Sequence, residues 1–438
     1  MNEHRLAELL DDATRPEPPM GPVVSASMLA GDRLRWRRRM QGTAAVAAAA
    51  ALAAAIPAFA FRAAPEPAAS AARHRTGVAF IATSRFTVVP VNLANGRARQ
   101  PIRVPAISGP AAAGPPIVSA PGGKTIWITG SAGLLPISVR TGRPGTPIPL
   151  HPGASAARLG AGVPETAVIT DHGRRAYVAT IPRGVLAVDL TSRKVLADIR
   201  VPYPYTLAAS PNGKLVYVGS AGGLTVISTQ TNTVVRTVKG TDWFGLWVAP
   251  DGTTVYSWTA IANQSLQFVT VVVRVDAATG ARSTFTIKNA RAAAMAPDGS
   301  LLYAAGDRAL YAVSPVTGKI AARWPLAEST AVALAVSSNG STAYVLGYKP
   351  TRKVALVLNV VNLRTGRTVR RISVPGSPSL YRGNLSLSPD GRTVYVEVNS
   401  PAGIWHADAI DASSGRLIAS TKLSVPATGV PDAVAFGR

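Results

Sequence analysis

The chain has 438 residues, of which 46 are Lys or Arg, 22 are Asp or Glu and none is Cys. The missing cysteines exclude disulfide bonds, thiolate metal sites and a cysteine nucleophile. Apolar residues make up 47% and charged residues 16%, which excludes intrinsic disorder over most of the length. A prior of about 150 residues per domain would give about three domains, although all-β folds often exceed that size as one domain.

The positive charge lies almost entirely in the C-terminal part. Residues 1–41 carry seven Arg and six acids, whereas residues 62–438 carry 39 bases and 16 acids, a net charge of +23. This excess fits either a solvated basic surface or affinity for an anionic surface, such as phospholipid headgroups or a phosphate-bearing cell-wall polymer. No nucleic-acid-binding motif occurs, so we expect no nucleic-acid partner.

Residues 1–41 are expected to form a mostly flexible tail. Its Leu6, Leu9 and Leu10 fall on one face of a short helix, which could dock a partner or could be too short to be stable alone. Residues 62–75 are a Pro/Ala linker.

Between them, residues 42–61 form an uncharged run of 20 residues, the length that one membrane-spanning helix needs. Five Arg lie between Arg33 and Arg39, and only Arg62 follows closely, so the positive-inside rule predicts a cytoplasmic N-terminus and an extracytoplasmic C-terminal part. The alternative is a cleaved signal peptide, since Ala58-Phe59-Ala60 resembles a processing site, and the product would be secreted. The long charged lead favours a single-pass anchor in the cell membrane.

Residues 76–438 contain a repeated unit. A phrase of the type S-P-D-G-K-x-V-Y-V recurs with turn glycines at Gly123, Gly173, Gly213, Gly252, Gly299, Gly340 and Gly391. A second turn, T-G-R or a relative of it, closes another hairpin in each unit. Glycine supplies the positive φ of tight hairpins, and the intervening segments alternate as β-strands do. Each unit is therefore predicted to be a four-stranded antiparallel sheet.

One further copy is split between the two ends of this region. Residues 77–83 match the strand after the first turn, and residues 431–437 match the strand before it. We predict an all-β fold, a β-propeller of eight blades closed by strand 431–437 and preceded by one transmembrane helix. Seven blades is the alternative, should residues 115–150 not form a full blade. The closed ring is predicted to be monomeric.

The repeated phrase, followed by an apolar strand that ends in T-G-R, resembles the YVTN-type β-propeller repeat of surface-layer and lactonase-like propellers. The similarity covers about 360 residues. It departs from the pattern at Asp171-His172-Gly173, where Pro-Asp-Gly is expected, and in one inner strand enlarged by Trp243, Phe244 and Trp247. The resemblance implies an exported binding or scaffolding role and no particular substrate.

A propeller binds ligands mostly at one mouth of its channel, where the loops before the inner strands converge. In the aligned repeats the position just before the inner strand is Pro115, Glu165, Tyr205, Phe244, Arg291, Val332, Gly383 and Asp432. We take as candidate ligand-binding residues the charged and aromatic members and their loop neighbours: Glu165, Tyr205, Phe244, Arg291, Asp432, Trp243, Tyr381 and Arg382. Such a set suits a carbohydrate or peptide-like ligand. Alternatively, the aromatic rings plug the channel and the charges are solvated.

We predict no catalytic residue, no metal site and no cofactor. The five His are dispersed, and the turn aspartates lack the spacing of a calcium loop. Neither a nucleophile elbow nor a phosphate-cradling loop motif is present. The favoured function is a non-catalytic, membrane-tethered module that binds a cell-envelope polymer or a partner protein. Two alternatives stay open: a lactonase-like hydrolase using mouth residues such as Glu165, His172 and Arg291, and a transmembrane sensor that signals through the N-terminal tail.

Overall fold

Every regular element in the described part of the chain is a β-strand, apart from one 3-10 turn at Asp171–Gly173, which confirms the all-β prediction. The computed structural model describes residues 77–84, 87–92, 97–104, 117–130, 132–150, 163–181, 183–220, 222–240, 245–262, 268–349, 355–375, 384–388, 390–399, 405–423 and 434–437. The tail, the predicted span at 42–61 and the linker lie outside these residues. None of the residues in these ranges forms a helix long and apolar enough to cross a bilayer.

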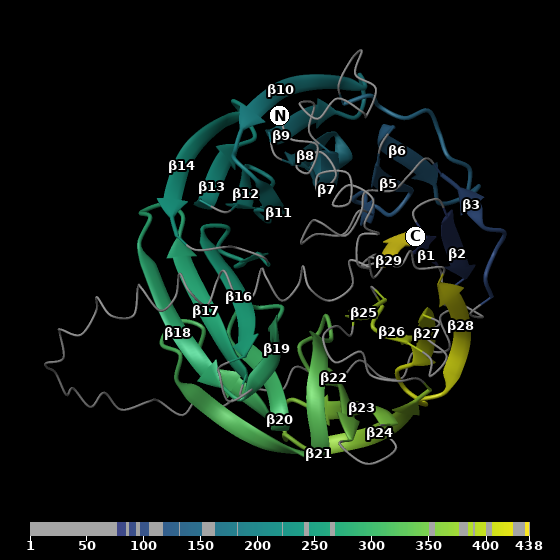
Figure 1. The fold of residues 1–438 in the computed structure, drawn as a ribbon, viewed down its shortest axis with the longest axis vertical. Coiled ribbons are helices and arrows are strands. Elements are labelled where there is room, and N and C mark those ends of the chain that lie inside the picture. The colour runs from purple at the N-terminus through teal and green to yellow at the C-terminus, as the bar shows by residue number, and fades with distance from the viewer. Residues whose placement is uncertain are drawn as a thin grey trace, which may run out of the picture. The chain divides into compact units, whose positions relative to one another are not determined.

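The strands pair antiparallel into successive sheets (Figure 1). The first sheet contains β29 (Val434–Gly437), β1 (Val78–Ser84), β2 (Thr87–Asn92) and β3 (Ile102–Arg103). The second contains β4 (Ile117–Ser119), β5 (Thr125–Gly130) and β6 (Gly133–Ser138). The third contains β7 (Val163–Thr170), β8 (Arg175–Ile181), β9 (Gly184–Asp189) and β10 (Lys194–Arg200). The fourth contains β11 (Pro204–Ala209), β12 (Leu215–Ser220), β13 (Gly223–Ser228) and β14 (Thr233–Lys239).

The remaining sheets continue the same order. The fifth contains β15 (Trp247–Val248), β16 (Thr254–Ala262), β17 (Phe268–Asp276) and β18 (Arg282–Lys288). A six-stranded sheet contains β19 (Ala290–Met295), β20 (Leu302–Val313), β21 (Ile320–Val336), β22 (Thr342–Lys349), β23 (Ala355–Asn362) and β24 (Thr368–Val374). The last contains β25 (Asn384–Leu387), β26 (Thr393–Asn399), β27 (Trp405–Asp411) and β28 (Leu417–Leu423).

The six-stranded sheet consists of two four-strand sets that share long strands. Residues 302–306 of β20 pair with β19, and residues 309–313 pair with the first part of β21. The second part of β21, residues 330–336, pairs with β22. The three-stranded second sheet is extended by isolated bridges from Leu134 to Ile148 and from Ile137 to Pro144.

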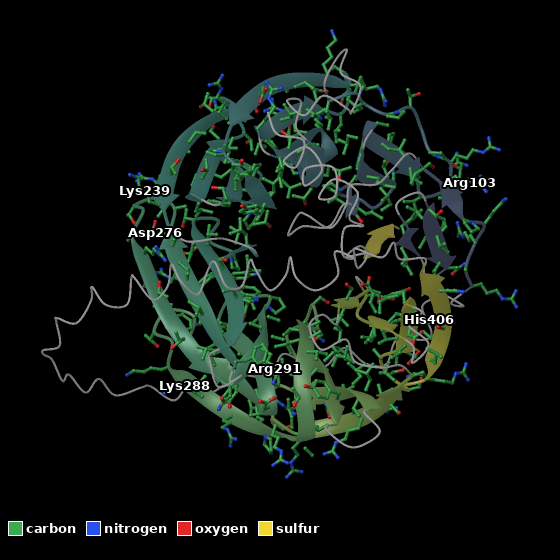
Figure 2. The ribbon with its side chains drawn as sticks, viewed as in Figure 1. Arg103, Lys239, Asp276, Lys288, Arg291 and His406 are labelled. Carbon is green, nitrogen blue, oxygen red and sulfur yellow. The ribbon has the colours of Figure 1, made fainter. Side chains whose placement is uncertain are left out.

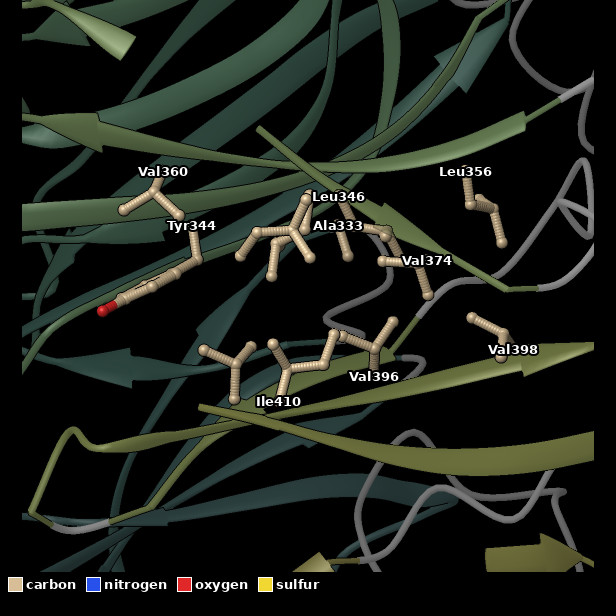
Figure 3. Close-up of a cluster of buried hydrophobic side chains, with 12 residues drawn as sticks. Ala333, Tyr344, Leu346, Leu356, Val360, Val374, Val396, Val398 and Ile410 are labelled. Carbon is tan, nitrogen blue, oxygen red and sulfur yellow. The ribbon is translucent and has the colours of Figure 1, made fainter. Parts of the chain in front are cut away.

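Apolar clusters fill the space between consecutive sheets. In one of them, Ala333, Tyr344, Leu346, Leu356, Val360 and Val374 pack against Val396, Val398 and Ile410 of the last sheet (Figure 3). Alternate residues of β26 face opposite ways, since Val394 and Val396 belong to this cluster while Tyr395 packs with Ala79 and Ile81 of the first sheet. The last sheet is thereby packed against the first.

The described sheets thus follow one another around a common axis, with the first strand of each set on the inside and the fourth on the outside (Figure 1). This arrangement is that of a β-propeller. The C-terminal strand β29 is hydrogen-bonded to β1, with Val78 opposite Gly437 and Ile81 opposite Val434. The first sheet is therefore built from both ends of the described chain.

The two ends of the strands differ, and we name them separately. The turn face contains two turns of most sheets, one between the first and second strands and one between the third and fourth. In the second sheet these turns lie near residues 120–125 and 138–144. The loop face holds the opposite strand ends, where each inner strand begins. Turns of neighbouring sheets are in contact at the turn face. For example, Gly252 in the fifth sheet lies so close to Pro211 in the fourth that a Cβ built on the glycine would be 3.7 Å from the proline Cδ.

Candidate functional site

Four of the aligned mouth positions share one structural irregularity at the loop face. In β11 the register passes from Pro204 opposite Ser220 to Thr206 opposite Gly219, so Tyr205 is the extra residue of a β-bulge. The same one-residue shift occurs in three other inner strands and makes bulge residues of Glu165, Arg291 and Val332. A bulge re-aims the side chain of its extra residue and bends the strand.

Proline and small residues stand before these bulges. Pro164 and Pro204 have no N–H to donate to a sheet ladder, and proline in strands is confined to edges, starts and bulges. Arg291 follows Ala290, which lies opposite Gly306. A Cβ at Gly306 would come within 1.5 Å of the Asn289 carbonyl oxygen, so only glycine permits this approach.

Arg291 is held by contacts from two other strands. Its guanidinium carbon lies 3.9 Å from the ring centroid of Phe268, which begins β17 of the preceding sheet. Its Nε lies 3.5 Å from Oδ1 of Asp307, in β20. The Arg291 side chain is 18% exposed and that of Asp307 is 50% exposed. Figure 2 labels Arg291 on the inner side of the sheets, whereas Arg103 and Lys239 belong to outer strands.

The Arg291 guanidinium is incompletely satisfied by this environment. Its Nε is buried and makes no hydrogen bond to any residue that the structure describes. The 3.5 Å approach of Asp307 is an ion pair without hydrogen-bond geometry. A ligand with an anionic or carbonyl group would meet the exposed 18% of this side chain, which Phe268 already positions, and not the buried Nε.

Two tyrosines lie at the bulge of β11, Tyr203 just before it and Tyr205 as its extra residue. Tyr203 is 52% exposed and has a φ of 48°, a left-handed conformation that is uncommon for a bulky residue. Tyr205 is half-buried. This part of the loop face therefore offers aromatic surface on which a sugar or a planar group can stack.

The structure describes only part of the other candidate residues. The backbone of Glu165 is described as the bulge residue of β7, and its side chain is not. A further set lies outside the described residues: Trp243, Phe244, Tyr381, Arg382 and Asp432. Sequence comparison of the repeats missed Phe268 and Asp307, since neither occupies the aligned position.

One combination considered for a hydrolase is wrong. His172 lies in the 3-10 turn at the turn face, whereas Glu165 and Arg291 lie at the loop face. The strand between Glu165 and His172 rises about 3.3 Å per residue, so roughly 20 Å separates the two residues along it. The described residues also contain no group of three or more His, Asp or Glu that could hold a metal ion.

No protein-family model and no curated protein matches the chain. A chain in a crystal structure of the mitotic checkpoint complex is 17% identical, with 67% of this chain and 87% of that chain covered and a TM-score of 0.46, which is too low to support a conclusion. A chain in a crystal structure of the eukaryotic initiation factor is 8% identical, with coverage of 80% and 96% and a TM-score of 0.53. The second similarity concerns the fold alone.

Proposed function

We propose that the chain is an eight-bladed, membrane-tethered, extracytoplasmic β-propeller of the YVTN type that binds a cell-envelope polymer or a partner protein and catalyses no reaction. Eight blades are supported by the two four-strand sets within the six-stranded sheet. They are also supported by the apolar clusters, which join each sheet, and each of the two sets within the six-stranded sheet, to the next and the last to the first.

One observation carries the binding role. The positions that differ in chemistry from repeat to repeat are the bulge residues of four inner strands, β7, β11, β19 and β21, and they include an acid, an aromatic and a base: Glu165, Tyr205 and Arg291. Turns and core positions are constant because the fold requires them, so side chains that vary at one re-aimed position are free to serve a ligand.

The tether and the exported location rest on the sequence. Residues 42–61 have the length and apolarity of a spanning helix, and the preceding arginines favour a cytoplasmic N-terminus. On this proposal the propeller holds its ligand outside the cytoplasm.

The binding role is tested by capture from cell-envelope fractions. We expect the immobilised wild-type protein to retain a polymer or protein that Glu165→Gln and Arg291→Ala retain at least about tenfold less, as truncation of a central charged contact commonly does. Arg371→Ala is the matched control, because Arg371 is an exposed arginine in the middle of the outer strand β24, away from both the turn face and the bulge residues. Equal capture by all four proteins would exclude the bulge residues as the site, and conversion of a lactone by the wild type would contradict a non-catalytic role.

A further inference from the structure

The turn face concentrates exposed positive charge. The turns that the structure describes carry seven Asp and no Glu. They carry 14 exposed bases: Arg97, Lys124, Arg140, Arg143, Arg174, Arg193, Lys194, Lys214, Arg282, Lys319, Arg364, Arg367, Arg392 and Arg416. The face is therefore strongly positive, even before the bases further along the outer strands are counted.

The aspartates of this face point into their own turns. Oδ1 of Asp276 accepts the amides of Ala278 and Thr279 at 2.9 and 3.0 Å. The same kind of bond is made by Asp189, Asp251, Asp298, Asp390 and Asp411. Most of the negative charge is thus engaged by backbone N–H groups, while the bases extend outward and can meet external anions.

Exposed apolar side chains gather at the same face. Of the eight large hydrophobic residues that are exposed in the described chain, only Tyr203 lies at the loop face. The other seven lie in a T-G-type turn or in the first residues of an outer strand: Leu196, Val234, Val235, Val316, Ile320, Val369 and Leu417. Bases lie next to several of them in the chain, as in Lys319-Ile320, Val369-Arg370 and Arg416-Leu417.

The described chain also begins at this face. Val78, the first residue of β1, lies opposite Gly437, the last residue of β29. In the other sheets the D-G turn joins these two strand ends, so Gly77 lies at the turn face. Whatever precedes Gly77 joins the propeller at the turn face.

We infer that the turn face is a docking surface for an anionic lipid bilayer. Lys and Arg would lie among the headgroups, and the exposed Val, Ile and Leu side chains would enter the boundary with the acyl chains. Soluble polyanions such as nucleic acid or a wall polymer would use the bases alone, whereas a bilayer uses both the bases and the apolar residues. The inference rests on the proposed tether and leaves the bulge residues at the loop face open to a ligand.

Vesicle sedimentation tests the inference with residues 72–438, which form one compact unit whose terminal strands pair with each other. We expect binding to vesicles made of equal parts phosphatidylcholine and phosphatidylglycerol, and little binding to phosphatidylcholine alone. The triple variant K194E/K319E/R367E should bind the anionic vesicles at least about tenfold more weakly. The variant Ile320→Ser/Val369→Ser should also bind more weakly, although its net charge is unchanged.

The matched control carries the same change of charge at the other face. Arg200, Lys239 and Lys288 are exposed and lie at the loop-face ends of the outer strands β10, β14 and β18. We expect R200E/K239E/K288E to bind like the wild type within about twofold, since charges beyond a Debye length of roughly 10 Å act weakly. Circular dichroism of every variant establishes that it is folded.

Three outcomes would overturn the inference. Equal losses in the two triple variants would show an effect of net charge without a docking face. Unchanged binding by the serine variant would show that apolar contact plays no part. Binding to duplex DNA or a wall polymer that depends on the turn-face bases, without vesicle binding, would assign the face to a polyanion. Envelope capture by the loop face is measured separately with Arg291→Ala, so either proposal can fail alone.

Discussion

The aspartates of the D-G turns accept backbone amides through Oδ1, and in Asp251 the second oxygen also accepts the Thr254 hydroxyl at 2.7 Å. Oδ1 of Asp298 accepts the Ser300 amide at 3.0 Å, and this bond lowers the pKa of the Asp298 carboxyl. Asn212 and Asn339 occupy the same turn position in other repeats, and their Oδ1 atoms accept the equivalent amides at 3.0 and 3.1 Å. An amide oxygen therefore satisfies the turn without a charge.

Substitution of Asp298 distinguishes the contribution of the turn hydrogen bond to stability from the contribution of the negative charge. A carboxyl whose pKa is lowered by folding contributes stability above its unfolded pKa, and this contribution is lost as the pH falls. We expect Asp298→Asn to keep the stability at pH 7 within about 0.5 kcal/mol and to lose less of it on acidification than the wild type. Asp298→Ala should lose about 1 kcal/mol at pH 7. Urea unfolding at both pH values checks this, and equal stability of the alanine variant would show that the turn bond contributes nothing.

The buried tyrosines of the repeat link neighbouring sheets. The Tyr217 hydroxyl donates to the Gly252 carbonyl oxygen of the next sheet at 2.6 Å. Burial, with the charges of Asp251 and Asp276, raises the pKa of Tyr217 to about 12. The neutral phenol is thus favoured in the native state, so its contribution is present below about pH 10 and is lost as the pH rises through about 12.

Tyr217→Phe tests this linkage. At pH 7 the variant should lose about 1 kcal/mol, because the Gly252 carbonyl loses its donor. Above about pH 10 its stability should fall less steeply than that of the wild type. Tyr203→Phe, at an exposed tyrosine, is the control and should match the wild type at pH 7. Parallel alkaline curves for wild type and Tyr217→Phe would contradict the assigned pKa.

At the scale of elements, the D-G turns of successive sheets are in contact. The proline of one turn packs against the glycine of the next, since a Cβ built on Gly340 would lie 3.7 Å from Cδ of Pro297. Ser338 replaces this proline in the following repeat, and a Cβ built on the next glycine, Gly391, would meet nothing within 4 Å. Because Ser338 has no proline ring, the contact between these two turns is absent, whereas Gly252, Gly299 and Gly340 each lie close to the proline of the preceding turn.

Ser338→Pro is therefore expected to stabilise the protein. Residue 338 is the second residue of a turn closed by the bond from the Gly340 amide to the Ser337 carbonyl, a position where proline is favoured. Restriction of the unfolded chain should add about 0.4–1 kcal/mol, and contact with Gly391 should add to this. The reverse change, Pro297→Ser, should cost a similar amount. A destabilised Ser338→Pro variant in urea unfolding would show that the backbone there does not accept proline.

The repeats made the strands and their pairing predictable. They did not predict that the second and third strands of one set would run on as the single long strand β20. Gly306-Asp307-Arg308-Ala309 contains no proline or asparagine, and the chain reverses there within β20 with Arg308 at a φ of 58°. In the second sheet, regular pairing stops near Pro144, Pro147 and Pro149, which lack the N–H that a ladder requires. The repeat pattern left open whether residues 115–150 form a full blade, and the missing donors explain why their fourth segment pairs only through isolated bridges.

The candidate site was predictable in part for a similar reason. Alignment of the repeats located the positions of Glu165, Tyr205 and Arg291, because a bulge recurs at a fixed distance from the turn glycine. It could not locate Phe268 and Asp307, since both contact Arg291 from other strands and one belongs to another sheet. Contacts between sheets depend on packing, which no single repeat encodes.

For the whole molecule, the positive charge also protects the outer strands. An outer strand has one unpaired edge, and Lys or Arg at such an edge opposes pairing with another chain. Lys239 and Lys288 lie on the outer strands β14 and β18 (Figure 2), and Arg370 lies on β24. Arg370 has a second role, since its Nη1 donates to the Ser414 carbonyl in the turn of the next sheet. The positive charge of the propeller thus serves the fold as well as any anionic partner.

Closure of the ring by β29 can be tested by changing only the chain connectivity. In the wild type, residues 424–433 lead from β28 to β29, and β29 pairs with β1, so the last and first sheets are joined by hydrogen bonds as well as by packing. A circular permutant that links Gly437 to Gly77 through an added Asp-Gly turn and begins at residue 434 keeps the same strands in the same sheets. Its last and first sheets would be joined by packing alone.

We expect this permutant to fold but to be less stable than the wild type by a few kcal/mol, because the ends of a long chain must be held together without the shared sheet. Circular dichroism and tryptophan fluorescence should then give urea transitions that no longer coincide. The control carries the same added turn but is opened between β16 and β17, which divides the fifth sheet between the two chain ends and restores closure by a shared sheet. It should unfold like the wild type. If both permutants match the wild type, packing between sheets suffices to close the ring, and the pairing of β29 with β1 is dispensable for stability.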